Sequence, residues 1–311
     1  SAMKKPAELY MRERMQISLP SGVRSSDDQV GLWPGTREYS MIGSDLVKAA
    51  RSGADLRDQR HLRQLMGGVP IGAVGDRFWT KIESEVAAML ATLDVDFAGE
   101  VSHLIEVEID GAWVIDTIDA TDTQVLEIAF SGAHGRHRTR PWLRLALLAL
   151  SEPSKIRSAV VLTRLDKKAE ENLKKKVDGG GELLDADRVA VERFVLAGES
   201  ETDRSRSANT IVQFALGVHQ RALCSPLPLF EYASWADLTK SSHVNTGLNS
   251  DLKNPSAAAI FGRRTFADFT NPADVFGPLH PIDQDFATTG TRFQAYARAL
   301  QDCFKETTMT R

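Results

Sequence analysis

Two acidic residues near the middle of the chain have the chemistry to bind a divalent metal ion. Asp116 lies in an apolar run, and Glu127 lies in the next apolar run, two positions before Ala129. Side chains two positions apart on a strand point to the same face, so Glu127 and Ala129 would share one. Carboxylates placed in this way can hold Mg²⁺, which generates hydroxide from water and stabilises a leaving oxygen. Ala129, on the same face as Glu127, supplies only a methyl group.

A second group of residues is basic and has the chemistry to bind phosphate. From Ile128 to Ser151 the sequence contains no Asp or Glu. Arginine side chains match phosphate and carboxylate geometry with two parallel donors. The stretch is therefore predicted to contact a DNA backbone or an acidic partner surface, and the alternative is an ordinary charged loop leading into a helix. The candidate contact residues are Arg136, His137, Arg138, Arg140 and Arg144.

A sheet and a crossover helix are needed to position these residues. Asp110-Gly111 tolerates the positive φ values of a tight type I′ turn and predicts a hairpin between the first two strands. A helix is predicted from about Pro141 to Leu150, with Pro141 in its first turn. A crossover of that length normally returns the chain to a parallel strand. The predicted strands cover residues 104–109, 113–118, 124–130 and 158–163.

The rest of the chain is predicted to be mostly helical. Helical spacing of apolar residues predicts a helix over 78–93 and a last helix over 293–304. Asp185 is predicted to cap a further helix, and His219 is interpreted as a core histidine on an apolar helix face. We expect three segments: a helical and loop lead-in over 4–95, an α/β core over 96–223, and a loop-rich extension with a final helix over 224–311.

The β-β-β-α-β order is the minimal core of the PD-(D/E)xK nucleases, the restriction-endonuclease-like fold. We therefore predict an α/β fold with a mixed sheet flanked by helices. Because Ala129 stands where these nucleases need a lysine beside the attacking water, we predict a degenerate centre, with Asp116, Glu127 and Ala129 as vestigial positions and no bound metal. Two alternatives remain open. The acids are ordinary residues of a half-exposed sheet, or they form an active Mg²⁺-dependent nuclease with a basic residue from elsewhere in the chain.

The bulk composition excludes several classes of protein. The chain has 311 residues, of which 42% are hydrophobic and 26% charged, as in an ordinary globular protein. No apolar run approaches the roughly 18 residues that span a bilayer, and no secretory pattern opens the chain, so a cytoplasmic location is predicted. The net charge of -4 provides no general attraction for nucleic acid. Contact with DNA would require a local patch or a larger assembly.

Several segments are similar, in order, to segments of the RecC (gamma) subunits of exodeoxyribonuclease V. The chain resembles the carboxy-terminal region of this family over roughly residues 8 to 304. Each motif is modest, and their order carries the resemblance. The matching segments are Leu9–Met15, the Pro70-x-Gly72-x-x-Gly75 run before Trp79, the Trp142-Leu143 pair within 140–146, and 225–230 followed by Trp235. Residues 251–262 match no segment of the family.

The resemblance implies a place in the RecBCD helicase–nuclease, which processes double-strand breaks for homologous recombination. It implies a nuclease-like region without the catalytic set, acting as a non-catalytic scaffold and DNA-guiding domain. Its partners would be the RecB and RecD subunits and double-stranded DNA ends. No cofactor is expected in this chain, because Mg²⁺ and ATP act in the partner subunits. A stand-alone protein-interaction module unrelated to DNA remains a further interpretation of the acidic net charge.

Overall fold

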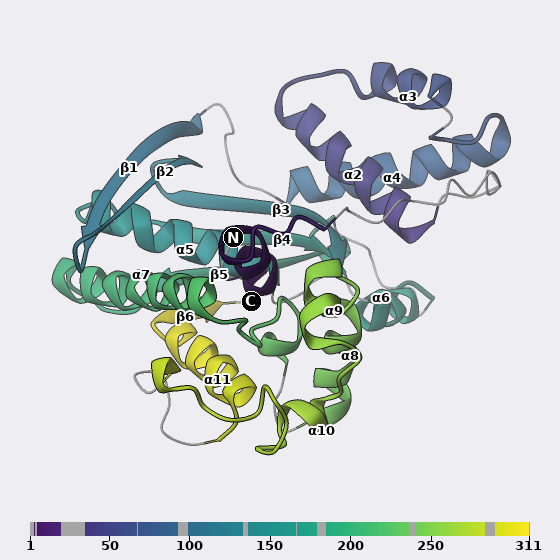
Figure 1. Cartoon of the computed structure of the whole chain (residues 1–311). Coiled ribbons are helices and arrows are strands. Elements are labelled where there is room, and N and C mark those ends of the chain that lie inside the picture. The colour runs from purple at the N-terminus through teal and green to yellow at the C-terminus, as the bar shows by residue number, and fades with distance from the viewer. Residues whose placement is uncertain are drawn as a thin grey trace.

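The computed structural model describes residues 3, 5–19, 35–66, 68–92, 99–132, 136–165, 167–178, 185–236, 240–283 and 290–310. Figure 1 shows a central sheet covered by helices, with a separate β-hairpin standing beside it. The strands are β1 (Val101–Ile109), β2 (Ala112–Ala120), β3 (Gln124–Gly132), β4 (Ser158–Arg164), β5 (Val189–Leu196) and β6 (Thr307–Thr310). The α-helices are α1 (Pro6–Leu9), α2 (Thr36–Arg51), α3 (Leu56–Leu65), α4 (Ala73–Ala91), α5 (Arg136–Ser151), α6 (Lys167–Asp178), α7 (Glu201–Cys224), α8 (Ser241–Asp251), α9 (Pro255–Phe261), α10 (Phe266–Phe269) and α11 (Arg292–Phe304). Short helical turns of other types are η1 (Tyr10–Arg14), η3 (Asp185–Arg188), η4 (Ala233–Trp235) and η5 (Pro281–Asp283).

The central sheet is mixed and has the strand order β3-β4-β5-β6. Strands β3 and β4 are parallel and are joined by the crossover helix α5, whereas β5 runs antiparallel to β4 and β6 antiparallel to β5. The α/β class and the mixed sheet predicted from the sequence are confirmed, as is the parallel return after α5. Helices α5 and α7 cover one face of the sheet, while α2 and α4 lie against the other (Figure 1).

Strands β1 and β2 form an antiparallel hairpin that is a two-stranded sheet of its own in the part of the chain described. Asp110 and Gly111 have φ values of 52° and 77°, and they join Ile109 to the directly opposite Ala112. Two successive positive φ values define the type I′ turn. The hairpin predicted from Asp110-Gly111 is therefore confirmed.

The two faces of the sheet are packed by different apolar clusters. Val125 on β3 and Val161 on β4 belong to the cluster that includes Trp142 of α5. Phe130 and Leu162 point to the opposite face and pack with residues of α2 and α4. This alternation follows from the two-residue period of a strand. It places Glu127 and Ala129 on the face covered by α5, because they share the odd register of Val125.

Residues 189–196 form strand β5, so the helix predicted to follow Asp185 is wrong. Val189 and Val191 pack on the side of α2 and α4, while Phe194 and Leu196 pack on the side of α5 and α7. A strand covered on both faces carries apolar residues in both registers, which hides the period of two. The irregular spacing that results resembles a helical pattern.

Helix α5 begins at Arg136, five residues before the start predicted at Pro141, so Pro141 lies inside the helix. Proline has no N–H, so the His137 carbonyl loses the helical hydrogen bond it would otherwise accept from residue 141. The helix continues because its apolar side is buried through Trp142, Leu145 and Leu148. Burial of these side chains overrides the local cost of the proline.

The segment from Pro70 to Gly75 turns sharply into α4. Gly72 has a φ of 75° and sits at the amino-terminal cap of the helix. A Cβ atom on Gly75 would lie 1.7 Å from the carbonyl oxygen of Pro70. Glycine is therefore required at the two positions for different physical reasons. Gly72 adopts a positive φ that other residues rarely adopt, and Gly75 leaves room for the backbone of Pro70. None of the helices in the described ranges is long and apolar enough to cross a membrane.

Candidate functional site

A cleft of about 440 Å³ lies between the hairpin, α5 and α7. Charged side chains enter it from β2 and α5, and an apolar wall is added by α7. The hairpin therefore acts as one wall of a site whose floor is the crossover helix. The lining residues used below are Val114 and Asp116 from β2, Thr139, Arg140, Leu143, Arg144 and Leu147 from α5, and Val212, Leu216 and His219 from α7.

The two candidate acids lie on different strands, and Asp116 is the one that lines the cleft. Asp116 is exposed on the inner register of β2, which it shares with the buried Ile118, and its Oδ1 accepts a hydrogen bond from the Thr117 N–H at 2.8 Å. Glu127 is half-buried on β3, directly opposite Val161. Ala129 lies two residues further along the same face and brings no polar atom to the site.

Arg144 brings a positive charge into the electrostatic range of both acids. Burial, and after it the positive charge of Arg140, lowers the pKa of Arg144, while Glu127 and then Asp116 act in the opposite direction. A guanidinium stays protonated in proteins despite such a shift. No ion pair recorded within the described ranges joins Arg144 to either acid. Arg144 therefore interacts with the two acids through longer-range electrostatic attraction and not through a direct ion pair.

The predicted basic residues divide between two roles in the structure. Arg138 donates from Nε and Nη2 to the two carboxylate oxygens of Glu192 at 2.7 and 2.6 Å, which ties α5 to β5. His137 Nε2 lies 2.9 Å from the Ser131 hydroxyl. Arg136 begins α5, and its side chain lies outside the described part of the chain.

Arg140 and Arg144 are the two predicted contact residues that line the cleft. They are four positions apart, so they lie on one face of α5. Arg140 is exposed and Arg144 is half-buried. This pair is the part of the basic stretch with the geometry to meet a ligand in the cleft.

His219 is exposed and lines the cleft, so its interpretation as a core histidine is wrong. It continues the stripe of Val212 and Leu216 on α7, at spacings of four and three residues. That spacing marks one helix face. The apolar helix face predicted from the sequence is present on α7, but near His219 it borders the cleft and not the core.

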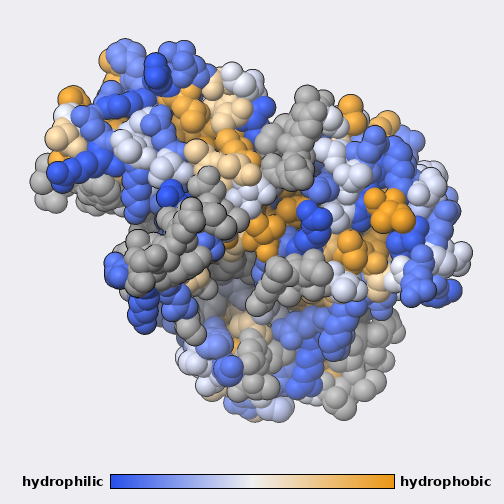
Figure 2. Space-filling model, turned by 180° about the vertical axis from the view of Figure 1, so that it is seen from behind, coloured by the Kyte–Doolittle hydropathy of each residue, from blue (hydrophilic) through white to orange (hydrophobic). Residues whose placement is uncertain are grey.

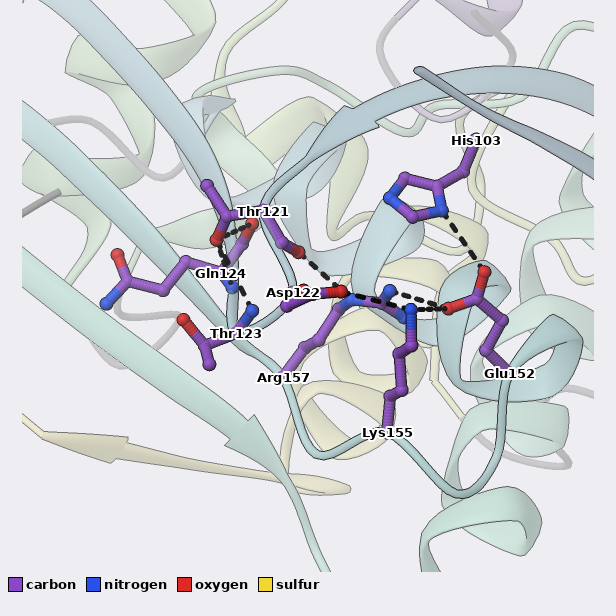
Figure 3. A network of polar contacts seen from close by, with 8 residues as sticks. All are labelled: His103, Thr121, Asp122, Thr123, Gln124, Glu152, Lys155 and Arg157. Carbon is purple, nitrogen blue, oxygen red and sulfur yellow. Dashed lines mark hydrogen bonds and ion pairs between the residues drawn. The ribbon is translucent and has the colours of Figure 1, made fainter. Parts of the chain in front are cut away.

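A polar network lies at the base of the hairpin (Figure 3). It is not predicted from the sequence. Glu152, just after α5, binds the buried Arg157 at 2.6 Å and lies 3.1 Å from Nδ1 of His103 on β1. Arg157 also donates to the Thr121 carbonyl at 3.2 Å, and Lys155 binds Asp122 at 3.0 Å. The hydrogen bond from Arg157, with those from Lys155 and His103, lowers the pKa of Glu152 to about 2 against the opposing effect of burial.

This network joins the hairpin to the sheet that carries Glu127. It links β1, the turn between β2 and β3, and the turn between α5 and β4 (Figure 3). The contacts that join different elements connect residues 33 to 49 positions apart in the chain, and no local pattern signals them. The network positions Asp116 relative to α5, because the hairpin forms one wall of the cleft.

Among the residues described, no group of three or more His, Cys, Asp or Glu side chains has an arrangement that could hold a metal ion. Asp116 and Glu127 together provide two carboxylates, and the cationic Arg144 lies within electrostatic range of both. The cleft itself combines one acid, Asp116, with the two arginines. Such a site can bind a phosphate through the arginines, or hold the arginines in place through the acid.

The fold and the cleft define an α/β protein with a mixed sheet, a parallel crossover and a hairpin-walled basic site. A protein-family model described as the RecC C-terminal domain matches residues 1–242. The chain belongs to the RecC C-terminal domain family, and the resemblance found in the sequence is confirmed over these residues. A search of curated proteins finds no match. The family implies a role in DNA processing as a subunit of RecBCD.

Proposed function

We propose that the chain is a non-catalytic scaffold and DNA-guiding domain of the RecBCD helicase–nuclease, acting in double-strand break repair and homologous recombination. Its proposed partners are the RecB and RecD subunits and DNA ends. The observation that carries the proposal is the pair Arg140 and Arg144 in the cleft beside Asp116. The pair offers cationic donors at the place where a nuclease of this fold would hold a metal ion.

The groups around Asp116 and Glu127 support the absence of catalysis. A metal-dependent nuclease keeps its carboxylates for Mg²⁺, which then generates hydroxide. Among the described residues, Asp116 and Glu127 belong to no group of three or more His, Cys, Asp or Glu side chains that could hold a metal ion. Arg144 is the cation near both acids, and a guanidinium is a poor proton acceptor because it remains charged. With Ala129 on the same face as Glu127, no side chain on β3 supplies the missing ammonium group.

The exposure of Arg140 and the position of Arg144 support the guiding role. Both line the cleft from one side of α5, where their two guanidinium groups can bind successive phosphates of a DNA backbone. Arg138 does not serve this role, because Glu192 accepts from both Nε and Nη2 on one edge of its guanidinium and holds the side chain against β5. The chain as a whole is acidic, so contact with DNA depends on this local pair.

The order of the central elements supports a PD-(D/E)xK-like core that has lost its catalytic set. A hairpin, a third strand and a parallel return through α5 follow one another as in that fold. We also propose the segments 4–95, 96–223 and 224–311 as the lead-in, core and extension. A separate aromatic cluster of Phe230, Phe261, Phe269 and Phe293 lies in the last segment, which also adds strand β6 to the central sheet.

A second candidate is an active Mg²⁺-dependent nuclease that uses Asp116 and Glu127. The observation in its favour is also Arg144, since a cation from α5 reaches the neighbourhood of both acids and can stand in for the absent lysine. The substitution Asp116→Ala distinguishes the two candidates. If the chain is an active nuclease, the substitution abolishes DNA cleavage; if the chain is a non-catalytic scaffold, neither the wild type nor the variant cleaves DNA.

DNA binding by the purified chain tests the proposed guiding role. A fluorescent duplex with single-stranded tails is titrated with the wild type and with Arg140→Glu/Arg144→Gln. We expect an affinity loss on the order of tenfold or more and a shallower salt dependence, because two phosphate contacts are removed. Arg206→Glu on α7, which changes an exposed arginine away from the cleft, serves as the control. Equal affinity for all three proteins would contradict the guiding role.

Co-expression with RecB and RecD tests the scaffold role. The proposal expects a stable complex that contains all three chains, and the cleft variants should remain in it. If neither partner co-purifies with the wild-type chain, the scaffold role is wrong. If the complex forms but the cleft variants bind DNA normally, only the guiding role is lost.

A further inference from the structure

The hairpin is strongly acidic. From Val101 to Ala120 the sequence contains five acidic residues and no Lys or Arg. This stretch lies beside the basic α5, but its charge is opposite. The acidic residues are Glu106, Glu108, Asp110, Asp116 and Asp119.

The outer face of the hairpin also exposes large apolar side chains. The inner register, which includes Ile105 and Ile118, is buried against the core. The outer register leaves Leu104, Trp113 and Ile115 exposed at 64%, 63% and 65%. On the side of the molecule where the hairpin lies, Figure 2 shows hydrophobic residues set among hydrophilic ones.

The strand register interleaves these apolar residues with the acids. Ile115 is directly opposite Glu106, and Trp113 is directly opposite Glu108. Leu104 is opposite Thr117 and therefore diagonal to Ile115. Directly opposite side chains lie within about 5.5 Å of each other, and diagonal ones within about 8 Å. The result is one continuous surface, here called the outer hairpin face, made of Leu104, Glu106, Glu108, Trp113 and Ile115.

Within the described part of the chain, the carboxylates of Glu106 and Glu108 form no recorded ion pair. Both residues are exposed. Exposed apolar patches with a polar rim mark interaction sites, and tryptophan is enriched among the residues that dominate interface energies. A like-charge surface repels a phosphate backbone, so nucleic acid is a poor occupant.

We propose that the outer hairpin face docks a protein segment that presents Lys or Arg side chains around apolar ones. Trp113, Leu104 and Ile115 form the apolar centre of this contact, and Glu106 and Glu108 pair with the basic residues. The inference rests on the proposed scaffold function, since it assigns one of the surfaces through which the chain holds a partner. The acidic hairpin and the basic cleft then serve different ligands on opposite faces of the same two strands.

Site-specific cross-linking in the co-expressed complex tests this assignment. A benzophenone cross-linker replaces Ile115, the complex with RecB and RecD is irradiated, and mass spectrometry identifies the linked segment. We expect a link to a RecB or RecD segment that contains Lys or Arg among apolar residues. A link to DNA added to the complex, or no link in a complex that has formed, overturns the proposal.

Charge reversal gives an independent measurement. Glu106→Lys/Glu108→Lys should weaken binding of the chain to its partner on the order of tenfold at low salt, because complementary rim charges are lost. Glu171→Lys/Asp178→Lys makes the same charge change on exposed positions of α6 and should leave the affinity unchanged. Thermal melts confirm that both variants fold.

The outcomes separate this inference from the scaffold role. If the wild type forms the complex and the two double variants bind equally well, the docking face is wrong and the scaffold role stands. If the wild type forms no complex with RecB or RecD, both are wrong. A gain of partner affinity in the Glu106→Lys/Glu108→Lys variant would also overturn the proposal, because it would indicate an acidic partner surface.

Discussion

Arg138 on α5 and Glu192 on β5 form a two-point contact in which Nε and Nη2 of the guanidinium donate at 2.7 and 2.6 Å. The two side chains are 20% and 13% exposed, so the pair is well shielded from water. Two residues later, Arg140 is exposed and lines the cleft. Neighbouring arginines of one helix therefore differ in role, and substitution can separate them.

Arg138→Ala is expected to lower the free energy of unfolding by about 1–3 kcal/mol, because Glu192 is left as a half-buried carboxylate without its partner. Arg140→Ala should change it by less than about 0.5 kcal/mol, as expected for an exposed side chain. Urea denaturation of the two variants measures both effects. Equal stability losses would show that the Arg138–Glu192 contact does not hold α5 to the sheet.

Gly75→Ala is expected to destabilise the turn into α4 by about 1–3 kcal/mol, because the added methyl group overlaps backbone. Its Cβ would lie 1.7 Å from the Pro70 oxygen, and backbone cannot move aside as a flexible side chain can. The matched control is Gly68→Ala, whose Cβ would lie 3.5 Å from the nearest atom, the Arg63 oxygen. If the two variants melt at the same temperature, the close approach at Gly75 is not a constraint on the fold.

Glu152→Ala is expected to loosen the hairpin, since the almost fully buried Arg157 loses its carboxylate partner. Leaving a buried charge unpaired costs about 3–5 kcal/mol, and the partial exposure of Glu152 places the effect at the lower end. Amide hydrogen exchange should accelerate in β1 and β2 more than in β4. Protection that falls evenly over the chain, or not at all, would contradict an anchoring role.

Asp251 provides a pH-dependent prediction. Burial raises the pKa of Asp251 to about 7, and the hydrogen bonds from the N–H groups of Ala233 and Tyr232 oppose this shift. In the unfolded chain the carboxyl loses its proton near its ordinary value of 3.8. Between these two values the folded state holds a proton that the unfolded state has released. The stability contributed by the protonated carboxyl is therefore complete below about pH 4 and declines as the pH rises to about 7.

Asp251→Asn removes this titration while keeping an oxygen that accepts from the same N–H groups. The difference in unfolding free energy between the variant and the wild type should therefore shift in favour of the variant by about 1.4 kcal/mol per pH unit over that window. Denaturation curves at pH 4.5, 5.5 and 6.5 measure it. Parallel pH profiles for the two proteins would show that Asp251 is already ionised in the folded state.

The sequence predicted the elements with strong local signals. The Asp110-Gly111 turn, the parallel crossover and the long helix at Phe78 all follow from short-range patterns, and the structure has them. Strand β5 was predicted wrongly as a helix because Val191 and Phe194 pack on opposite faces of the sheet, so the two-residue period of a strand is not visible in the sequence. The Glu152–Arg157–His103 network and the field of Arg144 on Glu127 depend on contacts between distant parts of the chain, which spacing cannot reveal.

Nuclease activity of the purified chain tests the central claim most directly. Linear double-stranded and single-stranded DNA are incubated with the chain and either Mg²⁺ or Mn²⁺, next to Asp116→Ala prepared in the same way. We predict no metal-dependent degradation by either protein, because Ala129 stands where the required ammonium group would be. Degradation by the wild type that disappears in Asp116→Ala would contradict the account and establish an active nuclease.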